Sequence, residues 1–280
     1  MRIIFLNKEA GITSFDALRD IKRRLKTGKV GHTGTLDKFA RGLLIVLTGR
    51  ALKLTQWFID CDKQYIGKIR FGKETDTLDP EGEIIEEAPE PSREEVEGVL
   101  SKFTGKIMQS PPAYSALHIN GKRAHELARS GQTPEMKKRP VTIYKLELCS
   151  WQPPFAEIFV HCSSGTYIRS LARDIALEAG SRGHLVELER TQIGKFILGQ
   201  EADGSINKAV ISKLGLPVIE ITPEQAKNIS HGKDLQTILE KSFLDNYSKD
   251  KAAALFYNEE LAAIIQEKDG KWVYGTVVVS

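Results

Sequence analysis

The stretch Gly31-His32-Thr33-Gly34-Thr35-Leu36-Asp37-Lys38-Phe39-Ala40-Arg41-Gly42 runs without a break into the apolar run Leu43–Leu47. Its glycines permit backbone angles that other residues avoid, and they let another chain approach closely. His32, two threonines and Asp37 add hydrogen-bonding groups and one carboxylate. An aspartate in such a loop can be a turn former or a helix cap as well as a catalytic group. The loop is therefore a candidate site, and the rest of the chain must decide between these interpretations.

The composition is that of an ordinary globular protein with one large domain and room for a small one, because the chain has 280 residues, 41% hydrophobic and 28% charged. Cys61, Cys149 and Cys162 are spaced too irregularly for a disulfide framework or a paired-cysteine metal site. No apolar run approaches the length of a membrane span, and Met1–Leu6 lacks the apolar core of a signal peptide. We therefore expect a cytoplasmic protein that needs no metal.

Charge is distributed unevenly along the chain, although the net charge is only +3. Residues 1–60 hold 12 Lys and Arg against 5 Asp and Glu, and residues 101–145 hold 9 against 2. Between these basic blocks, residues 74–97 hold 11 acidic residues against one arginine. Two basic blocks indicate a polyanionic partner whose phosphates they neutralise, and the alternative is that the charges only solvate the surface. The acidic segment is expected to face away from such a partner.

Hydrophobic periodicity predicts the elements around the loop. Ser14 is expected to cap a basic amphipathic helix, because apolar residues recur every three or four positions over 15–25. The run after the loop predicts a buried strand over 43–48. Lys63–Phe71 alternates as a strand that is buried on the face of Tyr65.

In the second half of the chain, the pattern predicts strands over 141–151, 155–162 and 184–191 and a helix over 166–179. The basic segment of about 110–140 is rich in turn residues and is expected to leave the sheet as a clamp on a large ligand.

A domain boundary is predicted near residue 219, after Leu214-Gly215-Leu216-Pro217. Residues 1–218 would form the main domain. Residues 219–280, with short strands joined by tight turns, would form a small β-barrel-like module. Residues 221–280 carry 7 Lys and Arg against 9 Asp and Glu, so a modest contribution to binding a polyanion is expected from this module.

Four parts of the sequence carry a family resemblance: Gly31–Asp37, Tyr65, Pro111-Pro112-Ala113-Tyr114-Ser115-Ala116 with Gly121, and Gly165-Thr166-Tyr167-Ile168-Arg169. In order and spacing they resemble the TruB family of bacterial tRNA pseudouridine-55 synthases over essentially the whole chain. The resemblance implies the pseudouridine synthase fold, which is α+β with a mixed, largely antiparallel sheet, packed helices and a central cleft. It also implies that the C-terminal module is an RNA-binding PUA domain that meets the tRNA acceptor stem.

The resemblance implies a reaction as well, the isomerisation of uridine 55 in the T-loop of tRNA to pseudouridine, without metal or organic cofactor. The target nucleotide must leave its stack to be reached. Asp37 matches the catalytic aspartate, which could attack C6 or C1′ or act as a base on the sugar. Arg169 matches the arginine that pairs with this carboxylate, and the pairing is expected to hold it ionised by lowering its pKa.

Four further residues match substrate-binding positions of the family. Tyr65 is expected to lie against the uracil, where it could stack or assist proton removal at C5. Stacking is the favoured role, because a phenol with an ordinary pKa near 10 is a poor base unless its surroundings change that pKa. Tyr167 is expected to line the pocket, Leu188 to pack near the uracil, and His32 to help occupy the gap that the nucleotide leaves in the T-loop. Without the resemblance, Tyr65 and Leu188 would be interpreted as strand core and His32 as a loop residue bonded to backbone.

The chain departs from the family pattern in its loops. Lys8-Glu9-Ala10-Gly11 and Asp37-Lys38-Phe39-Ala40 each lack a proline that the family usually has, so these loops are expected to be less rigid. Arg41, His118 and His125 also replace more usual residues, which leaves the details of the tRNA contacts open.

Two other functions remain open at this point. One is the function of a relative of the family that depends on a guide RNA. The segment 111–129 argues against it, because this segment favours the bacterial form, which is expected to act on tRNA as a monomer without guide RNA. The other is the function of a tRNA-binding or folding protein that catalyses no reaction. The presence of Asp37, Tyr65 and Arg169 argues against it.

Overall fold

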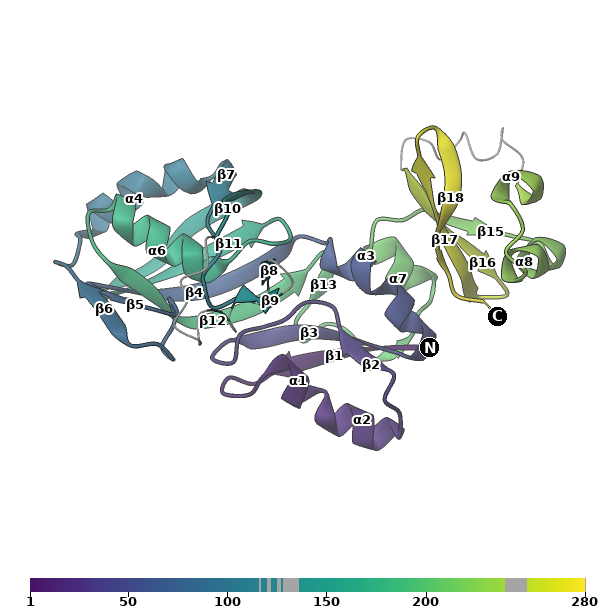
Figure 1. Ribbon diagram of the computed structural model, residues 1–280, viewed down its shortest axis with the longest axis horizontal. Helices are drawn as coiled ribbons and strands as arrows, with labels where there is room; N and C mark the ends of the chain where they lie inside the picture. Colours follow the sequence, from purple (N-terminus) through teal and green to yellow (C-terminus); the bar gives the residue numbers. More distant parts are fainter. Residues whose placement is uncertain (116, 120–121, 125–126, 128–135, 240–250, 280) are drawn as a thin grey trace.

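The computed structural model describes residues 1–115, 117–119, 122–124, 127, 136–239 and 251–279. Within these residues, ten strands form one sheet along the path β14-β1-β3-β12-β4-β11-β10-β7, with β2 paired to β3 and β13 paired to β12 (Figure 1). The strands of this sheet are β1 (Arg2–Lys8), β2 (Val30–His32), β3 (Arg41–Thr48), β4 (Lys63–Phe71), β7 (Gly105–Gln109), β10 (Arg139–Gln152), β11 (Phe155–Cys162), β12 (Gly183–Ile193), β13 (Phe196–Ile197) and β14 (Gly204–Ser205).

The sheet is mixed and largely antiparallel, as predicted. Of the paired neighbours among the described strands, β3 and β12 run parallel and the others antiparallel. On β4, every second residue from Lys63 to Phe71 is buried, Tyr65 among them, which confirms the predicted inward face. The predicted buried strand over 43–48 is also confirmed, as most of β3.

Helices cover the sheet in two groups. α1 (Ser14–Ala17) and α2 (Arg19–Leu25) pack on β1 and β3, where Leu18 and Ile21 contact a buried apolar cluster. α4 (Arg93–Leu100) and α6 (Ile168–Glu178) pack on the part of the sheet that contains β4 and β11. The remaining short elements of this part are η1 (Gly49–Leu54), α3 (Thr55–Ile59), β5 (Lys73–Thr75), β6 (Ile84–Glu87), η2 (Ser101–Phe103) and α7 (Lys208–Lys213).

The first helix differs from its prediction in two ways. It is split into α1 and α2, and its N-cap is Thr13, whose side chain accepts the backbone N–H of Asp16 in a capping box. Ser14, the predicted cap, is the first helical residue and is buried. Its hydroxyl is therefore free to bond a different part of the chain.

The C-terminal unit contains β15 (Val218–Glu220), α8 (Pro223–Ser230), α9 (Leu235–Ile238), β16 (Ala252–Tyr257), β17 (Glu260–Lys268) and β18 (Lys271–Val277). Its described strands form a four-stranded sheet in the order β15-β16-β17-β18. No pairing of β15 with β18 is found among them, so the predicted barrel-like closure is not confirmed. The unit lies against η1, α3 and α7 at one end of the large sheet (Figure 1).

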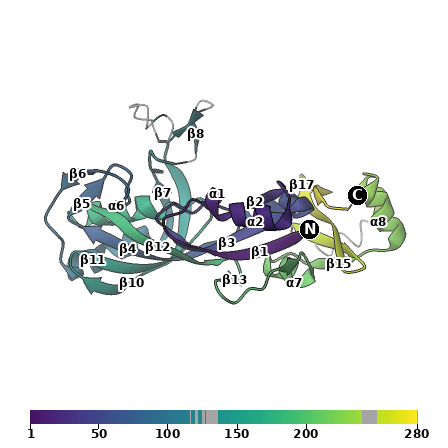
Figure 2. The ribbon, with the colours of Figure 1, turned by 90° about the horizontal axis from the view of Figure 1, so that it is seen from below.

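The predicted clamp is described only in part. β8 (His118–Ile119) and β9 (Lys122–Arg123) pair as a hairpin that stands away from the large sheet (Figure 2). His125 and residues 128–135 lie outside the described residues. Among the helices that the structure describes, none is long and apolar enough to cross a membrane.

Candidate active site

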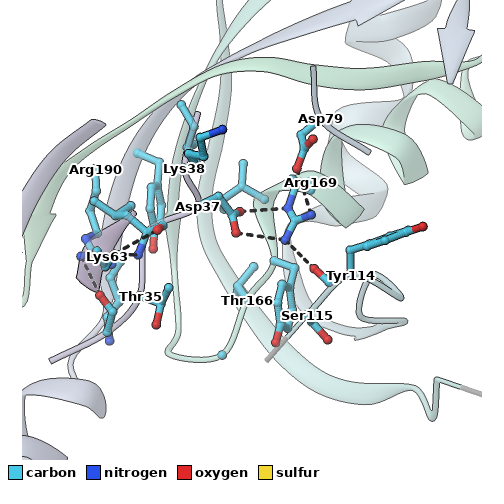
Figure 3. A pocket seen from close by; sticks show the side chains of 18 of the residues that line it. Thr35, Asp37, Lys38, Lys63, Asp79, Tyr114, Ser115, Thr166, Arg169 and Arg190 are labelled. Carbon is cyan, nitrogen blue, oxygen red and sulfur yellow. Dashed lines mark hydrogen bonds and ion pairs between the residues drawn. The ribbon is translucent and has the colours of Figure 1, made fainter. Parts of the chain in front are cut away.

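A cleft of about 960 Å³ lies over the centre of the large sheet, and loop residues 32–38 form part of its wall. β4, β12 and the start of α6 supply much of the rest. Figure 3 shows Asp37 and Arg169 pointing toward each other inside this cleft, with Asp79 on the far side of the guanidinium. The volume lies in the range of roughly 300–1,000 Å³ that is typical of small-molecule sites.

The polar loop is held by contacts with the first residue of α1 and with the segment that precedes this helix. The Ser14 hydroxyl donates to the carbonyl oxygen of Leu36 at 3.0 Å and accepts the Leu36 N–H at 2.9 Å. The carbonyl oxygen of Lys38 accepts the Gly11 N–H at 2.8 Å and lies 3.4 Å from the Nζ of the buried Lys8. These contacts bracket Asp37 on both sides, and none of them needs the missing prolines.

Arg169 binds Asp37 with one edge of its guanidinium. Nη2 donates to Oδ1 of Asp37 at 3.0 Å, and Nε lies 2.9 Å from Oδ2, at ion-pair distance but outside hydrogen-bond geometry. The other donors of Arg169 reach Asp79 Oδ2 at 3.1 Å and the carbonyl oxygens of Thr77 at 2.8 Å and Tyr114 at 3.0 Å. Because Arg169 is 4% exposed and held by several chain segments, it presents one fixed edge to the carboxylate.

The electrostatics of Asp37 differ from the expectation in direction. Burial raises the pKa of Asp37 above its usual value, the Arg169 guanidinium opposes this rise, and the neighbouring Asp79 carboxylate adds to it. The pairing with Arg169 is thus present, but its effect on the pKa is smaller than the effect of burial. The side chain is still 35% exposed to the open cleft, so a nucleotide that fills the cleft would desolvate it further.

Tyr65 lies on β4 between its Cα partners Val160 on β11 and Arg190 on β12. Its side chain is buried, and burial raises the pKa of Tyr65 to about 12, although Arg190 acts in the opposite direction. A phenol with this pKa stays protonated at neutral pH. The ring is therefore suited to stacking and is a poorer base than an ordinary tyrosine.

Leu188 lies on β12 opposite Gly67 of β4, two residues along the strand from Arg190, and it is buried in the wall of the same cleft. Its neighbourhood is apolar, which suits the face of a base.

Tyr167 is placed by its backbone. Gln109 at the end of β7 accepts the Tyr167 N–H at 2.8 Å and donates to the Tyr167 carbonyl oxygen at 3.0 Å. The Arg139 guanidinium lies 4.8 Å from the centre of the Tyr167 ring and donates to the carbonyl oxygen of Gly165 at 2.8 Å. Tyr167 is the N-cap residue of α6, so the same turn positions both Tyr167 and Arg169.

His32 ends β2 and is half-buried at the cleft, where its Nδ1 accepts the N–H of Gly34 at 3.4 Å. Burial and the nearby Arg190 lower the pKa of His32, so the imidazole is neutral at physiological pH. A neutral ring can stack against bases and donate one hydrogen bond from Nε2.

All the site residues predicted from the sequence line this one cleft: His32, Asp37, Tyr65, Tyr167, Arg169 and Leu188. Sequence reasoning missed Asp79, Gln109 and Arg190. It also placed the acidic segment away from the site, whereas Asp79 and Glu81 line the cleft. Asp79 carried no signal beyond its membership of an acidic run, and the best signal for Arg190 was its position two residues after Leu188 on an alternating strand.

Arg190 and Lys63 are two buried cations on the other side of the cleft from Arg169 (Figure 3). Arg190 donates from Nε to the carbonyl oxygen of Leu43 at 2.8 Å and from Nη2 to that of Gly34 at 3.1 Å, so it ties both ends of the polar loop to β12. Burial lowers the pKa of Lys63 to about 8. Among the described residues, no group of three His, Cys, Asp or Glu side chains is arranged to hold a metal ion.

The sequence model described as "TruB family pseudouridylate synthase (N terminal domain)" matches residues 22–168. The chain is 40% identical over 280 residues to tRNA pseudouridine synthase B of Francisella tularensis subsp. tularensis, covering 97% of this chain and 92% of that protein. It is 45% identical over 198 residues to the protein of the same name from Borreliella burgdorferi, covering 70% of each.

Solved structures share the fold at low sequence identity. A chain of a Cbf5-Nop10-Gar1 complex superposes with a TM-score of 0.68 at 22% identity, covering 99% of this chain and 83% of that one. A chain of the archaeal box H/ACA sRNP Nop10-Cbf5 complex gives a TM-score of 0.69 at 21% identity, covering 99% and 85%.

Proposed function

The chain belongs to the TruB family of pseudouridylate synthases, and on this premise we propose that it converts uridine 55 in the T-loop of tRNA to pseudouridine, with Asp37 as the catalytic residue. The observation that carries the proposal is the Asp37 carboxylate, which faces the cleft and is held along one edge of the buried Arg169. In this proposal the chain catalyses the reaction alone, in the cytoplasm, without metal, organic cofactor or guide RNA.

The reaction breaks the bond from N1 to C1′, turns the uracil and joins C5 to C1′. The proton is then lost from C5 and N1 takes up a proton, so the product is an isomer of the substrate. Asp37 starts this sequence as an ionised carboxylate, whether it attacks C6 or C1′ or removes a proton from the sugar. Arg169 holds the carboxylate in one orientation, which reduces the cost of reaching the reactive geometry. Arg169 also favours the anionic form against the effect of burial.

The uracil is free during the step in which it turns, so the cleft must retain it. Tyr65 and Leu188 provide a buried aromatic face and an apolar face on adjacent strands, and Tyr167 closes the side formed by α6. Tyr65 stacks as a neutral phenol because its pKa is about 12. His32, neutral and at the rim, takes the place that the extruded nucleotide leaves, which offsets part of the stacking lost on extrusion.

The domain division at about residue 218 is part of this proposal. All the described residues that line the cleft lie within 1–218, and the C-terminal unit would act as a PUA-like domain that adds contacts to the acceptor stem.

The deciding experiment incubates the purified protein with an unmodified T-arm hairpin and maps pseudouridine by nucleotide position. We expect modification at the position of uridine 55 without added RNA. A protein that modifies the hairpin only with a guide RNA would be the guide-dependent relative. Tight hairpin binding without any pseudouridine would identify a tRNA-binding protein, and the proposal would be wrong.

A further inference from the structure

Phe15 is exposed at the wall of the active cleft. It is 66% exposed, the largest value among the exposed large apolar side chains that the structure describes, and it lies in the lining of the cleft that contains Asp37. A single exposed aromatic residue is ordinary by itself. Three further observations about its placement, its neighbours and its surroundings distinguish this one.

The first observation is that the backbone under Phe15 is fixed relative to the catalytic loop. Thr13 and Asp16 form a capping box on either side of it. Ser14, its direct neighbour, exchanges two hydrogen bonds with Leu36, the residue before Asp37. The backbone at Phe15 therefore has a defined position in the wall of the cleft that contains Asp37.

The second observation is a cation over the ring. The Nζ of Lys22 lies 4.3 Å from the centre of the Phe15 ring, at the distance of a cation–π contact. An aromatic ring has two faces, and with one face near Lys22 the high exposure leaves ring surface open to solvent.

The third observation is the charge of α2, which carries Lys22, Arg23 and Arg24 in sequence. Arg23 pairs with Asp20, whereas no acidic partner is found for Lys22 or Arg24 within the described part of the chain. Of these basic residues, Lys22 lies beside the ring. An exposed aromatic ring beside a basic residue without an acidic partner is the combination by which proteins bind unpaired nucleotides, with stacking on the base and neutralisation of the phosphate.

We propose that Phe15 is a second base-stacking subsite, which takes an unpaired base of the RNA substrate next to the nucleotide that enters the cleft, while Lys22, whose Nζ lies over the ring, neutralises an adjoining phosphate. This inference rests on the proposed function, because the extruded nucleotide brings its neighbours in the strand to the mouth of the cleft. Base stacking tolerates any base, so the subsite holds the strand in register and leaves the choice of target to the cleft.

The test compares Phe15→Ala, Phe15→Leu and Phe15→Trp with the wild-type protein on a T-arm hairpin. Loss of one base–aromatic stack should raise the hairpin Kd about 5- to 100-fold in the Ala and Leu variants, whereas Trp should retain binding. The kcat at saturating hairpin should stay within about threefold of wild type, because the proposed role of Phe15 is in binding the strand and not in the chemical step. Tyr144→Ala is the matched control, since Tyr144 is 53% exposed on β10 and does not line the cleft.

A second measurement identifies the base. Hairpins with one abasic nucleotide at each loop position beside the target are titrated against wild type and Phe15→Ala. At the stacked position, the losses of binding free energy caused by the abasic nucleotide and by Phe15→Ala should not add, because both changes remove the same contact. Additive losses at every position, or an unchanged Kd in Phe15→Ala, would overturn the subsite while wild-type modification of the hairpin leaves the proposed function standing. A wild-type protein that does not modify the hairpin would instead refute the proposed function.

Discussion

The Asp37 carboxylate is the group on which the proposed chemistry depends. Replacing it by Asn keeps the shape and a hydrogen-bond acceptor for Arg169 but removes the negative charge. We expect Asp37→Asn to bind T-arm RNA within a few-fold of wild type and to lose isomerisation by at least three orders of magnitude, as is typical for loss of a nucleophile or base. Binding by filter retention and pseudouridine formation in single turnover measure the two effects. Turnover within a factor of ten of wild type would refute the assignment.

The same residue links activity and stability to pH. Burial raises the pKa of Asp37 above the value of about 3.9 in the unfolded chain. Between these two pKa values the folded chain holds a proton that the unfolded chain has lost, so stability falls as pH rises through this interval. We therefore expect the difference in melting temperature, Asp37→Asn minus wild type, to become more positive as the pH is raised from 4 toward neutrality.

The activity of the wild-type protein should show the corresponding shift. Because the ionised carboxylate is the reactive form, the acid limb of kcat/KM should lie above pH 4. A pH-independent difference in melting temperature, or an acid limb at or below the ordinary aspartate value, would contradict the direction of the shift.

The packing of β3 against β12 depends on Gly42. Gly42 has φ +108°, and a Cβ built on it would lie 2.4 Å from the carbonyl oxygen of Arg190. We expect Gly42→Ala to lower the free energy of unfolding by about 3 kcal/mol or more, because a strained φ and a backbone clash add together. Gly28→Ala is the matched control, since no atom lies within 4 Å of its Cβ. Equal melting temperatures for the two variants would show that the strands can separate at little cost.

The start of β10 and the two residues before it form the basic block Lys137, Lys138 and Arg139. Arg139 donates a hydrogen bond to the carbonyl oxygen of Gly165 and lies over the Tyr167 ring. Lys137 and Lys138 are exposed. We expect Lys137→Ala with Lys138→Ala to weaken hairpin binding and to reduce the slope of log Kd against log salt by about 1.5, since each phosphate contact contributes about 0.7 to 0.9. Lys268→Ala with Lys271→Ala, on the C-terminal sheet, is the control, and equal slopes for both pairs would exclude phosphate contacts by this block.

At the scale of the whole molecule, the two sheets share a hydrophobic core. Leu54 and Phe58 on η1 and α3 belong to the same buried cluster as Ala254 and Phe256 on β16. The Nζ of Lys53 also donates to the carbonyl oxygen of Val277 at 2.9 Å. Removing the C-terminal unit would therefore expose large apolar side chains of η1 and α3.

We expect the chain of residues 1–218 to melt at a lower temperature than the full chain but to modify the T-arm hairpin at near full kcat below its melting temperature, because the cleft lies within it. Full-length tRNA should bind more weakly, by about 1–2 kcal/mol, through loss of a linked binding event. Measuring kcat and KM on both RNAs with both chains tests this. A fall in kcat on the hairpin with the short chain still folded would show that the C-terminal unit supports the active site.

Local patterns made much of the fold predictable. The alternation over 63–71 and the apolar run over 43–48 depend only on residues that are neighbours in sequence, so the strands and the inward face of Tyr65 followed from periodicity. The cap at Thr13 did not follow from periodicity, because the Ser14 hydroxyl bonds Leu36, 22 residues away. The split at Leu18 did not follow from it either.

The candidate site was predictable where short motifs hold its residues. By itself the sequence determined the polar loop with Asp37, the neighbouring pair Tyr167 and Arg169, and the basic blocks, because these are properties of residue type and local spacing. A family motif could be recognised in them without knowing any distance.

Only the tertiary structure decided which of these groups meet and in which direction the pKa of Asp37 shifts. Asp79, in the loop between β5 and β6, reaches Arg169 on α6 across 90 residues. Arg190 reaches Gly34 across 156 residues, because its strand β12 pairs with β3, the strand that follows the polar loop. The pKa of Asp37 moved opposite to the expected direction for the same reason: burial is a property of the assembled cleft, and its cost to a charge exceeds the effect of one paired arginine.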